Sequence, residues 1–384
     1  GSKAGSGLTT GSSNVGIGYT ALNAAITGDK NIGIGEYSGA LLTDGDHNIF
    51  MGRSAGYSNT TGNRNIAIGN QSYDAADTES DNIAIGYDAL GGAVAGGAQN
   101  LAIGNYSLDA AVTGSGNIAL GYSAGSAATS AANSVIMGYE AVSTGVLTGA
   151  RNVAIGYQTM RNATSGADNT FVGAEVVGNG VLTGSNNVGM GRGALKDATG
   201  ADGNTALGYN SMAELTTGDN NTAIGTESMD TGVVTGAKNI ALGWRAGNNL
   251  TSGSNNVVIG AVDVTADADN QISISSGDGG LSWITGDANG LVAHKISVVA
   301  VTGSTTLTDA QSGSYVYCTS SGAPTLPATA EIGQQYTIIN NTGSDLTPGL
   351  GSSNSTVPSS HTAISDDAAR TYVAVAANTW FFVG

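Results

Sequence analysis

Three histidines are the first residues to consider as metal ligands, because imidazole is the commonest side chain at transition-metal sites. They are His47, His294 and His361. The three lie far apart in the sequence, and none has a partner at a recognised ligand spacing. A metal on a threefold axis would need only one histidine from each of three chains, so this arrangement stays open. We interpret the histidines as solvated or hydrogen-bonded and expect no metal and no other cofactor.

An acidic cluster could bind calcium instead. Its members are Asp263, Asp267 and Asp269. Carboxylates are the usual ligands of this ion, but the cluster lacks the glycine and the terminal glutamate of a known calcium loop. We therefore interpret the three aspartates as a solvated cap of a strand.

Catalysis would need a nucleophile or a pair of carboxylates. The motif Gly-x-Ser-x-Gly does not occur between a strand and a helix, and the glycine-rich stretches recur with a regular period, unlike a phosphate-binding loop. Some fibre-like proteins cleave polysaccharides with carboxylates from neighbouring subunits, and a pair drawn from Glu175, Asp197 and Glu214 leaves that alternative open. We expect a protein without enzymatic activity.

One long segment offers a site for recognition. Residues 343–362 form a 20-residue stretch rich in glycine, serine and proline. Loops of this length in compact domains are usually functional or mobile. We expect receptor contacts from Asp345, Asn354 and His361, with a disordered or subunit-packing loop as the alternative.

A repeat dominates the rest of the chain. The pattern Asn-x-small-aliphatic-Gly recurs every 17 or 18 residues and predicts a parallel β-solenoid (a β-roll) of about fifteen coils. Its first position falls at Asn14, Asn31, Asn48, Asn65, Asn82, Asn100, Asn117, Ser134, Asn152, Asn169, Asn187, Asn204, Asn221, Asn239 and Asn256. Amides stacked in such a column can pair with the coils above and below. We expect a structural ladder that includes Asn31, Asn65, Asn82, Asn117, Asn152, Asn187, Asn221 and Asn239.

The pattern within each coil predicts two short strands. The second pentad position is β-branched in every coil but one and the fourth is always aliphatic, so we expect pairs such as Ile66 and Ile68, or Ile83 and Ile85, to point together into the interior. The closing glycine can turn the chain at a corner, and in twelve coils another glycine lies three residues before the asparagine. Segments 19–22, 87–90 and 209–212 are expected to form a second, weaker strand, since they are too short for a stable helix.

The third pentad position suggests an assembly. It is Gly or Ala in eleven of fifteen coils and is never charged, although the alternation places it on the outer face. Small side chains permit close approach of another backbone, so a closed cyclic oligomer is expected to cover Ala84, Ala119 and Ala154. Charged residues such as Arg64 and Arg151 precede the asparagine, which marks that edge as solvated.

The repeat ends near residue 264. We expect a lead-in at 1–13, the rod at 14–264, a neck or cap at 265–294 and a C-terminal β-domain at 295–384. All four prolines and the single cysteine lie in this last segment. Its strand candidates, 296–301, 314–318, 335–339, 371–376 and 380–383, predict an antiparallel sandwich or barrel.

The run Asn-Ile-Ala-Ile-Gly-Tyr-Asp-Ala-Leu at 82–90 resembles the repeats of bacteriophage tail fibres and, more distantly, the head repeats of trimeric autotransporter adhesins. This resemblance implies a homotrimer of left-handed parallel β-rolls that projects a binding tip from a virion or a cell. The segments 333–341 and 378–383 resemble small β-domains that close phage fibres.

The amino-acid composition argues against several classes of partner. Twelve Lys and Arg against 29 Asp and Glu give a formal net charge of −17, which would repel nucleic acid. No apolar run approaches the ~20 residues that span a bilayer, so we expect no membrane insertion. One cysteine excludes an intrachain disulfide framework.

Together these features predict an all-β structural fibre protein of a phage tail or similar extracellular appendage. Its expected partners are further copies of itself, a glycan or protein of the host cell surface, and other tail or fibre proteins. The alternatives are the passenger of a bacterial trimeric surface adhesin and a purely mechanical spacer. Glycan or cell binding by the C-terminal domain would separate an attachment fibre from a spacer.

Overall fold

The computed structural model describes residues 1–92, 96–110, 112–277, 282–286, 292–294, 298–301, 307, 315–318, 324–326, 335–340, 364, 369–376 and 379–383. In these residues the chain is all-β. It divides into two compact units, Gly1–Ala293 and His294–Gly384. The first unit contains the predicted solenoid.

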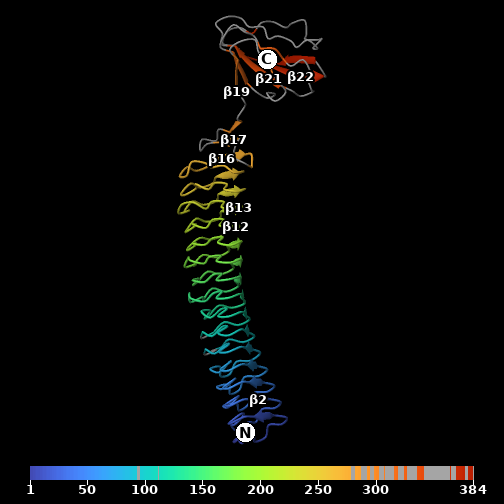
Figure 1. Cartoon of the computed structure of the whole chain (residues 1–384), viewed down its shortest axis with the longest axis vertical. Helices are drawn as coiled ribbons and strands as arrows, with labels where there is room; N and C mark the ends of the chain where they lie inside the picture. Colours follow the sequence, from blue (N-terminus) through green and yellow to red (C-terminus); the bar gives the residue numbers. More distant parts are fainter. Residues whose placement is uncertain are drawn as a thin grey trace. The chain divides into compact units, whose positions relative to one another are not determined.

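Each coil of the first unit contributes one short strand. Fifteen strands have three residues each: β1 (Val15–Ile17), β2 (Ile32–Ile34), β3 (Ile49–Met51), β4 (Ile66–Ile68), β5 (Ile83–Ile85), β6 (Leu101–Ile103), β7 (Ile118–Leu120), β8 (Val135–Met137), β9 (Val153–Ile155), β10 (Thr170–Val172), β11 (Val188–Met190), β12 (Thr205–Leu207), β13 (Thr222–Ile224), β14 (Ile240–Leu242) and β15 (Val257–Ile259). Each pairs in parallel with the strand of the next coil, so identical positions align, as in Ala67, Ala84 and Ala102. Figure 1 shows the coils stacked in sequence order.

The parallel sheet continues past the predicted end of the rod. Strand β16 (Ile272–Ser275) pairs in parallel with β15, and β17 (Ser282–Gly286) then pairs antiparallel with β16. Together with β18 (Val292–His294), these strands complete an eighteen-stranded sheet in the described part of the chain. At the other end, Leu8 of the expected lead-in forms a parallel bridge with Ile26 of the first coil.

The predicted inner and outer faces of the strands are reversed in the structure. Ala67 and Ala84 are fully buried in the core, together with Leu90 and Leu108. By contrast, Ile68 is 37% exposed. A strand of three residues directs two side chains to one face and one to the other. Because Leu, Met or Val from the following turn already fills much of the narrow interior, only the single third-position side chain fits inside beside it.

Large residues in the third position confirm this orientation. Phe50 is fully buried, and a Cβ atom on Gly39 or Gly56 would lie within 2.8 Å of its ring. Phe171 has the same relation to Gly189, where a Cβ atom would lie 2.9 Å from the ring. The interior therefore keeps its volume by offsetting a large side chain with glycines nearby.

The predicted second strand of each coil is wrong. Segments 19–22, 87–90 and 209–212 form turns, in which two residues per segment adopt positive φ. In the coil of β5 these are Asp88 at φ 56° and Leu90 at φ 49°. A left-handed conformation breaks the extended backbone that a strand needs. The turn amides bond instead to the next coil, as in the 2.9 Å hydrogen bond from Leu90 N–H to the Ser107 carbonyl.

The two sets of repeat glycines are required for different reasons. The glycine that closes each pentad has φ between 97° and 144°, as predicted for a corner. The glycines three residues before the asparagine do not share this conformation. At Gly62 a Cβ atom would lie 2.2 Å from the Glu79 carbonyl oxygen of the next coil, so close stacking requires the glycine there.

The second unit holds a five-stranded sheet with the order β19 (Val298–Val301), β20 (Tyr315–Cys318), β21 (Gln335–Asn340), β22 (Ala369–Ala376) and β23 (Thr379–Val383). All five predicted strands are present. The expected antiparallel arrangement is correct only for β21–β23, because β19, β20 and β21 pair in parallel. The choice between a sandwich and a barrel stays a prediction.

Candidate functional site

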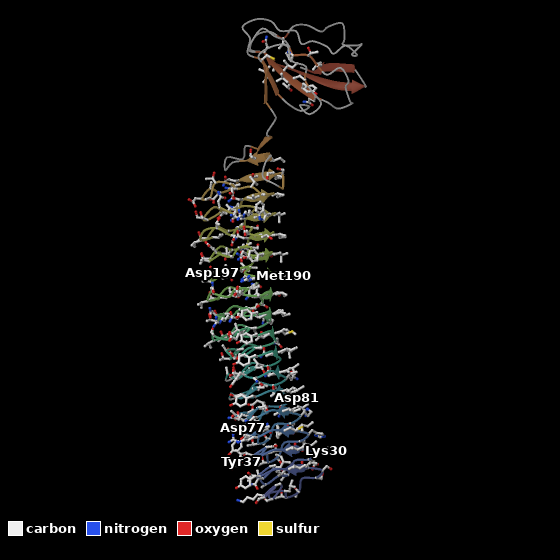
Figure 2. All side chains as sticks on the ribbon, viewed as in Figure 1. Lys30, Tyr37, Asp77, Asp81, Met190 and Asp197 are labelled. Carbon is white, nitrogen blue, oxygen red and sulfur yellow. The ribbon has the colours of Figure 1, made fainter. Side chains whose placement is uncertain are left out.

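The outer surface of the long sheet is an aliphatic face. We define it as the second and fourth pentad positions of strands β1–β15, where Thr170, Thr205 and Thr222 are the only residues that are not aliphatic. Many of its side chains are strongly exposed, among them Ile17 at 55%, Met190 at 45% and Ile224 at 41%. In Figure 2 the side chains of this face project from the strand side of the rod, where Met190 is labelled. A continuous apolar strip of this length marks an interaction surface.

The sequence analysis expected an interface but placed it on the wrong residues. Ala84, Ala119 and Ala154 are fully buried inside their own coils and cannot touch another chain. The third position is small and uncharged because it faces the interior. Phe50 and Phe171, which share this column, were the signal that could have revealed its buried side.

Charged pairs border the aliphatic face along the column that precedes each asparagine. Arg64 forms a bidentate pair with Asp81, with Nε–Oδ1 at 2.6 Å and Nη2–Oδ2 at 2.8 Å. The hydrogen bond from Arg64 holds the pKa of the Asp81 carboxyl below its usual value. Arg151 and Asp168 repeat this arrangement at 2.6 Å and 2.7 Å. This border is solvated, as predicted, because both guanidinium side chains are 61% exposed.

On the edge of the aliphatic face opposite the charged pairs, tyrosines lie one or two residues after the corner glycines. A continuous series of ring contacts joins five consecutive coils, with centroids 5.3–5.8 Å apart. Its members are Tyr87, Tyr106, Tyr122, Tyr139 and Tyr157. Exposed aromatic rings next to an apolar strip extend the surface that a partner could cover.

Buried asparagines form a hydrogen-bonded column through the coils. The side-chain oxygen of each asparagine accepts the backbone N–H of the next residue in the column, as Asn14 Oδ1 accepts from Asn31 at 2.8 Å; in one coil Ser134 takes the place of an asparagine. The amide nitrogen donates to a turn carbonyl of the next coil, as from Asn31 to Gly45 at 2.7 Å. The same pattern includes the other predicted members, Asn65, Asn82, Asn117, Asn152, Asn187, Asn221 and Asn239. Their role is structural, because they are fully buried or nearly so.

The acidic cluster near the end of the solenoid caps the preceding coil. Asp269 Oδ1 accepts the Ser254 backbone N–H at 2.7 Å, and Asp267 Oδ1 accepts the Ser252 hydroxyl at 3.0 Å. Asp263 Oδ1 accepts the Asn249 N–H at 3.3 Å. Across the part of the chain that the structure describes, no group of three His, Cys, Asp or Glu side chains is arranged to hold a metal ion.

The carboxylates considered for catalysis have separate surroundings. Glu175 lies 3.6 Å from the Arg192 guanidinium, and Glu214 accepts the Gly232 N–H at 3.0 Å. Asp197 belongs to the coil of β11, between the coils of the other two. A pairing between neighbouring subunits therefore stays a prediction, as does the absence of catalysis.

The predicted receptor contacts Asp345, Asn354 and His361 lie outside the described residues, as does the whole segment 343–362. Their role stays a prediction. Within the described residues, no helix is long and apolar enough to pass through a lipid bilayer. The sequence matches no protein-family model and no curated protein, so function has to be inferred from the geometry of the rod.

Proposed function

We propose that this chain is the shaft of a structural, non-enzymatic fibre of a virion tail or similar extracellular appendage. The observation that carries the proposal is the aliphatic face, which extends along fifteen consecutive strands and is covered by no other part of the described chain. Water contact with so many aliphatic side chains is unfavourable, and burial returns roughly 25 cal/mol for each Å² of apolar surface removed from water. Further copies of the same chain offer a surface of equal length and register.

The proposed assembly is a homotrimer in which three aliphatic faces meet and the charged borders stay in water. Arg64 and Arg151 remain paired with their own aspartates in this arrangement, so no charge has to be buried. The parallel stacking of coils makes each shaft rigid, and the tail-fibre resemblance of the repeat supports the number three. The shaft would hold the C-terminal domain against a host-cell surface.

The oligomeric state tests this proposal. Sedimentation of the intact chain should give about three times its mass of 37.7 kDa. The double variant Ile103→Glu and Ile224→Glu should be monomeric yet keep its β-structure, because both side chains are exposed on the face and an assembled trimer would bury the carboxylates.

Two control variants test whether the effect is specific to the aliphatic face. Val146→Glu with Val233→Glu introduces the same charges at apolar residues outside the strands that are more exposed than Ile103 and Ile224, and should leave the mass unchanged. Ala154→Glu should instead unfold its coil, since Ala154 is fully buried. A stable monomer of the unaltered chain would exclude the proposal.

Attachment is tested separately by deleting residues 343–362. If this segment contacts the receptor, adsorption to host cells should be lost while trimer mass and thermal melting stay unchanged, because solenoid stability is a sum over neighbouring coils. Undiminished adsorption would favour a site on the shaft or a spacer role.

A further inference from the structure

A hollow opens beside Trp244, the last aromatic residue that directly follows a corner glycine of the repeat. Tyr122, Tyr139 and Tyr157 occupy the column of these residues in successive coils and stack with centroids 5.3 and 5.7 Å apart, so each ring covers the one before it. Trp244 occupies the equivalent position in the coil of β14, but the next coil has Ala261 there. Trp244 is 54% exposed, and a space of about 220 Å³ lies beside it where the next coil has only the methyl group of Ala261.

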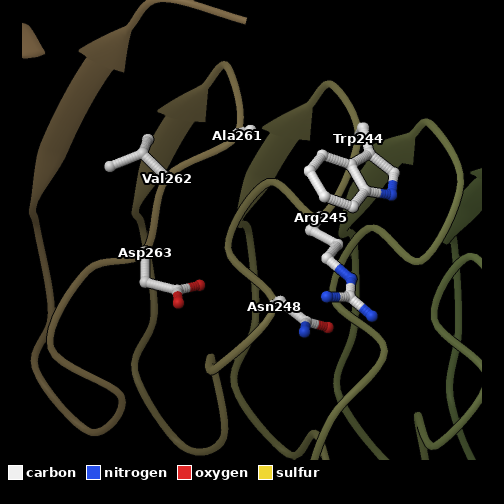
Figure 3. A pocket seen from close by; sticks show the side chains of 6 residues that line it. All are labelled: Trp244, Arg245, Asn248, Ala261, Val262 and Asp263. Atoms are coloured by element: carbon white, nitrogen blue, oxygen red, sulfur yellow. The ribbon is translucent and has the colours of Figure 1, made fainter. Parts of the chain in front are cut away.

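The walls of this hollow come from two successive coils. Figure 3 shows Trp244 and Arg245 on one side and Val262 and Asp263 on the other. Asn248 also lines the hollow. Trp244 and Val262 are its large apolar groups, Ala261 adds a methyl group, and the other three side chains are polar.

The polar side chains are held in place by the coils around them. Arg245 Nε bonds to Glu227 Oε2 at 2.6 Å, and its guanidinium carbon lies 5.1 Å from the centre of the Trp244 ring. Asn248 Oδ1 accepts the Asp230 N–H at 3.3 Å, which leaves its amide nitrogen without a hydrogen bond within the described residues. Asp263 uses Oδ1 for the Asn249 N–H at 3.3 Å. An amide donor and the second carboxylate oxygen therefore remain for a ligand.

We infer that this hollow binds a single neutral sugar ring. A pyranose presents C–H groups on one face, which suits an aromatic surface, and a rim of hydroxyls, which both donate and accept hydrogen bonds. The indole provides the aromatic surface. The Asn248 amide nitrogen can donate to a hydroxyl, and the Asp263 carboxylate can accept from one. The space is smaller than the ~300–1,000 Å³ of sites for drug-sized ligands, so it suits one ring.

The charge of the site selects against an acidic sugar. Glu227 already neutralises Arg245, and Asp263 adds a carboxylate with no ion pair among the described residues. The chain as a whole carries a formal net charge of −17, which would also repel an anion. The inference does not require self-association, because the hollow lies beside the corner and turn and its lining residues do not belong to the aliphatic face.

Saturation-transfer NMR with simple glycosides tests the inference on the intact chain. The probes are the methyl β-pyranosides of glucose, galactose and N-acetylglucosamine, with N-acetylneuraminic acid as the anionic probe. At least one neutral glycoside should bind saturably with a Kd of a few mM, on the order of −4 kcal/mol or weaker. Trp244→Ala and Asp263→Asn should each weaken that binding about tenfold or more, as expected when a stacking or hydrogen-bonding group is removed from a small ligand.

Matched variants distinguish loss of the binding site from loss of the fold. Tyr209→Ala removes an exposed ring from the same column outside the hollow and should leave the affinity unchanged. Trp244→Phe keeps an aromatic surface and should retain binding if Trp244→Ala fails to fold. No saturable binding up to about 50 mM, unchanged affinity in both site variants, or preference for N-acetylneuraminic acid would overturn the inference. Sedimentation of the same samples reports on self-association, so each proposal can fail alone.

Discussion

At the scale of single residues, the asparagine column shows how a solenoid satisfies polar groups in its interior. Asn187 Oδ1 accepts two hydrogen bonds from Asn204, at 2.9 Å and 3.1 Å, and its amide nitrogen donates to the Ala201 carbonyl at 2.8 Å. A buried N–H without a partner costs about 1–3 kcal/mol, so each member prevents a defect in the coil above it. The column is accordingly sensitive to any residue with a shorter side chain.

Ser134 is the one such residue, and it supports a prediction of increased stability. Its hydroxyl accepts the Asn152 N–H at 3.1 Å but donates only to Ala132 in its own coil, at 3.3 Å. Ser134→Asn should restore a bond to the Gly149 carbonyl of the next coil and stabilise this region by about 1 kcal/mol. Slower hydrogen exchange in the coils of β7–β9 would show it. Ser165→Asn, at an exposed position, is the control, and equal protection in both variants would contradict the prediction.

At the scale of the element, the spacing of the repeat predicted the coils but not the orientation of their strands. The spacing of the asparagines predicted the coils, their parallel register and the corner glycines. It could not predict which side of a three-residue strand faces inward, because that depends on how much of the interior the turn residues fill. Leu90 and Met160 fill it from backbone at φ 49° and 52°, a conformation that bulky residues avoid in isolation. Local propensity therefore predicted strands where tertiary packing forms turns.

The coil as a unit supports a prediction about deletion. Removing residues 204–220 deletes one whole coil and brings Asn221 onto Asn187 in the same register that Asn204 now occupies. The rod should fold with similar melting behaviour and be shorter by about 4.8 Å, one strand spacing. Circular dichroism and small-angle scattering would measure both.

A deletion of half a coil is the matched control. Removing residues 204–211 deletes β12 but keeps the residues that follow it, so β13 no longer follows β11 at the spacing of one coil; the mismatch should expose interior side chains and destabilise the rod strongly. Equal stability of the two deletions would show that register does not determine the fold.

At the scale of the whole molecule, half-buried carboxylates make stability depend on pH. Burial, with repulsion from Asp88, raises the pKa of both Asp74 and Asp109 to about 6. Burial, with repulsion from Glu227, does the same for Asp230. Below their folded pKa these groups bind more protons in the folded chain than in the unfolded chain. Their contribution is therefore complete below pH ~4 and is lost as the pH rises through about 6.

The melting temperature should thus rise on acidification from pH 7.5 to pH 5. The triple variant Asp74→Asn, Asp109→Asn and Asp230→Asn should melt higher than the unaltered chain at pH 7.5 and lose most of this dependence. Asp197→Asn, repeated in the same background, controls for the general loss of negative charge. Near pH 3 the trend should reverse, because the paired carboxyls Asp81 and Asp168 have lowered pKa values and lose their stabilisation on protonation. A flat profile between pH 7.5 and pH 5 would contradict this account.

The uniform register of the coils has a consequence for inheritance. Any two repeats can recombine at equivalent codons, and the product gains or loses whole coils while the parallel register of the strands is kept. Reach can therefore change in a single genetic event without loss of register. The hollow beside Trp244 is lined only by residues of two late coils, so such exchanges among the earlier repeats would alter its distance from the N-terminus and leave its walls intact.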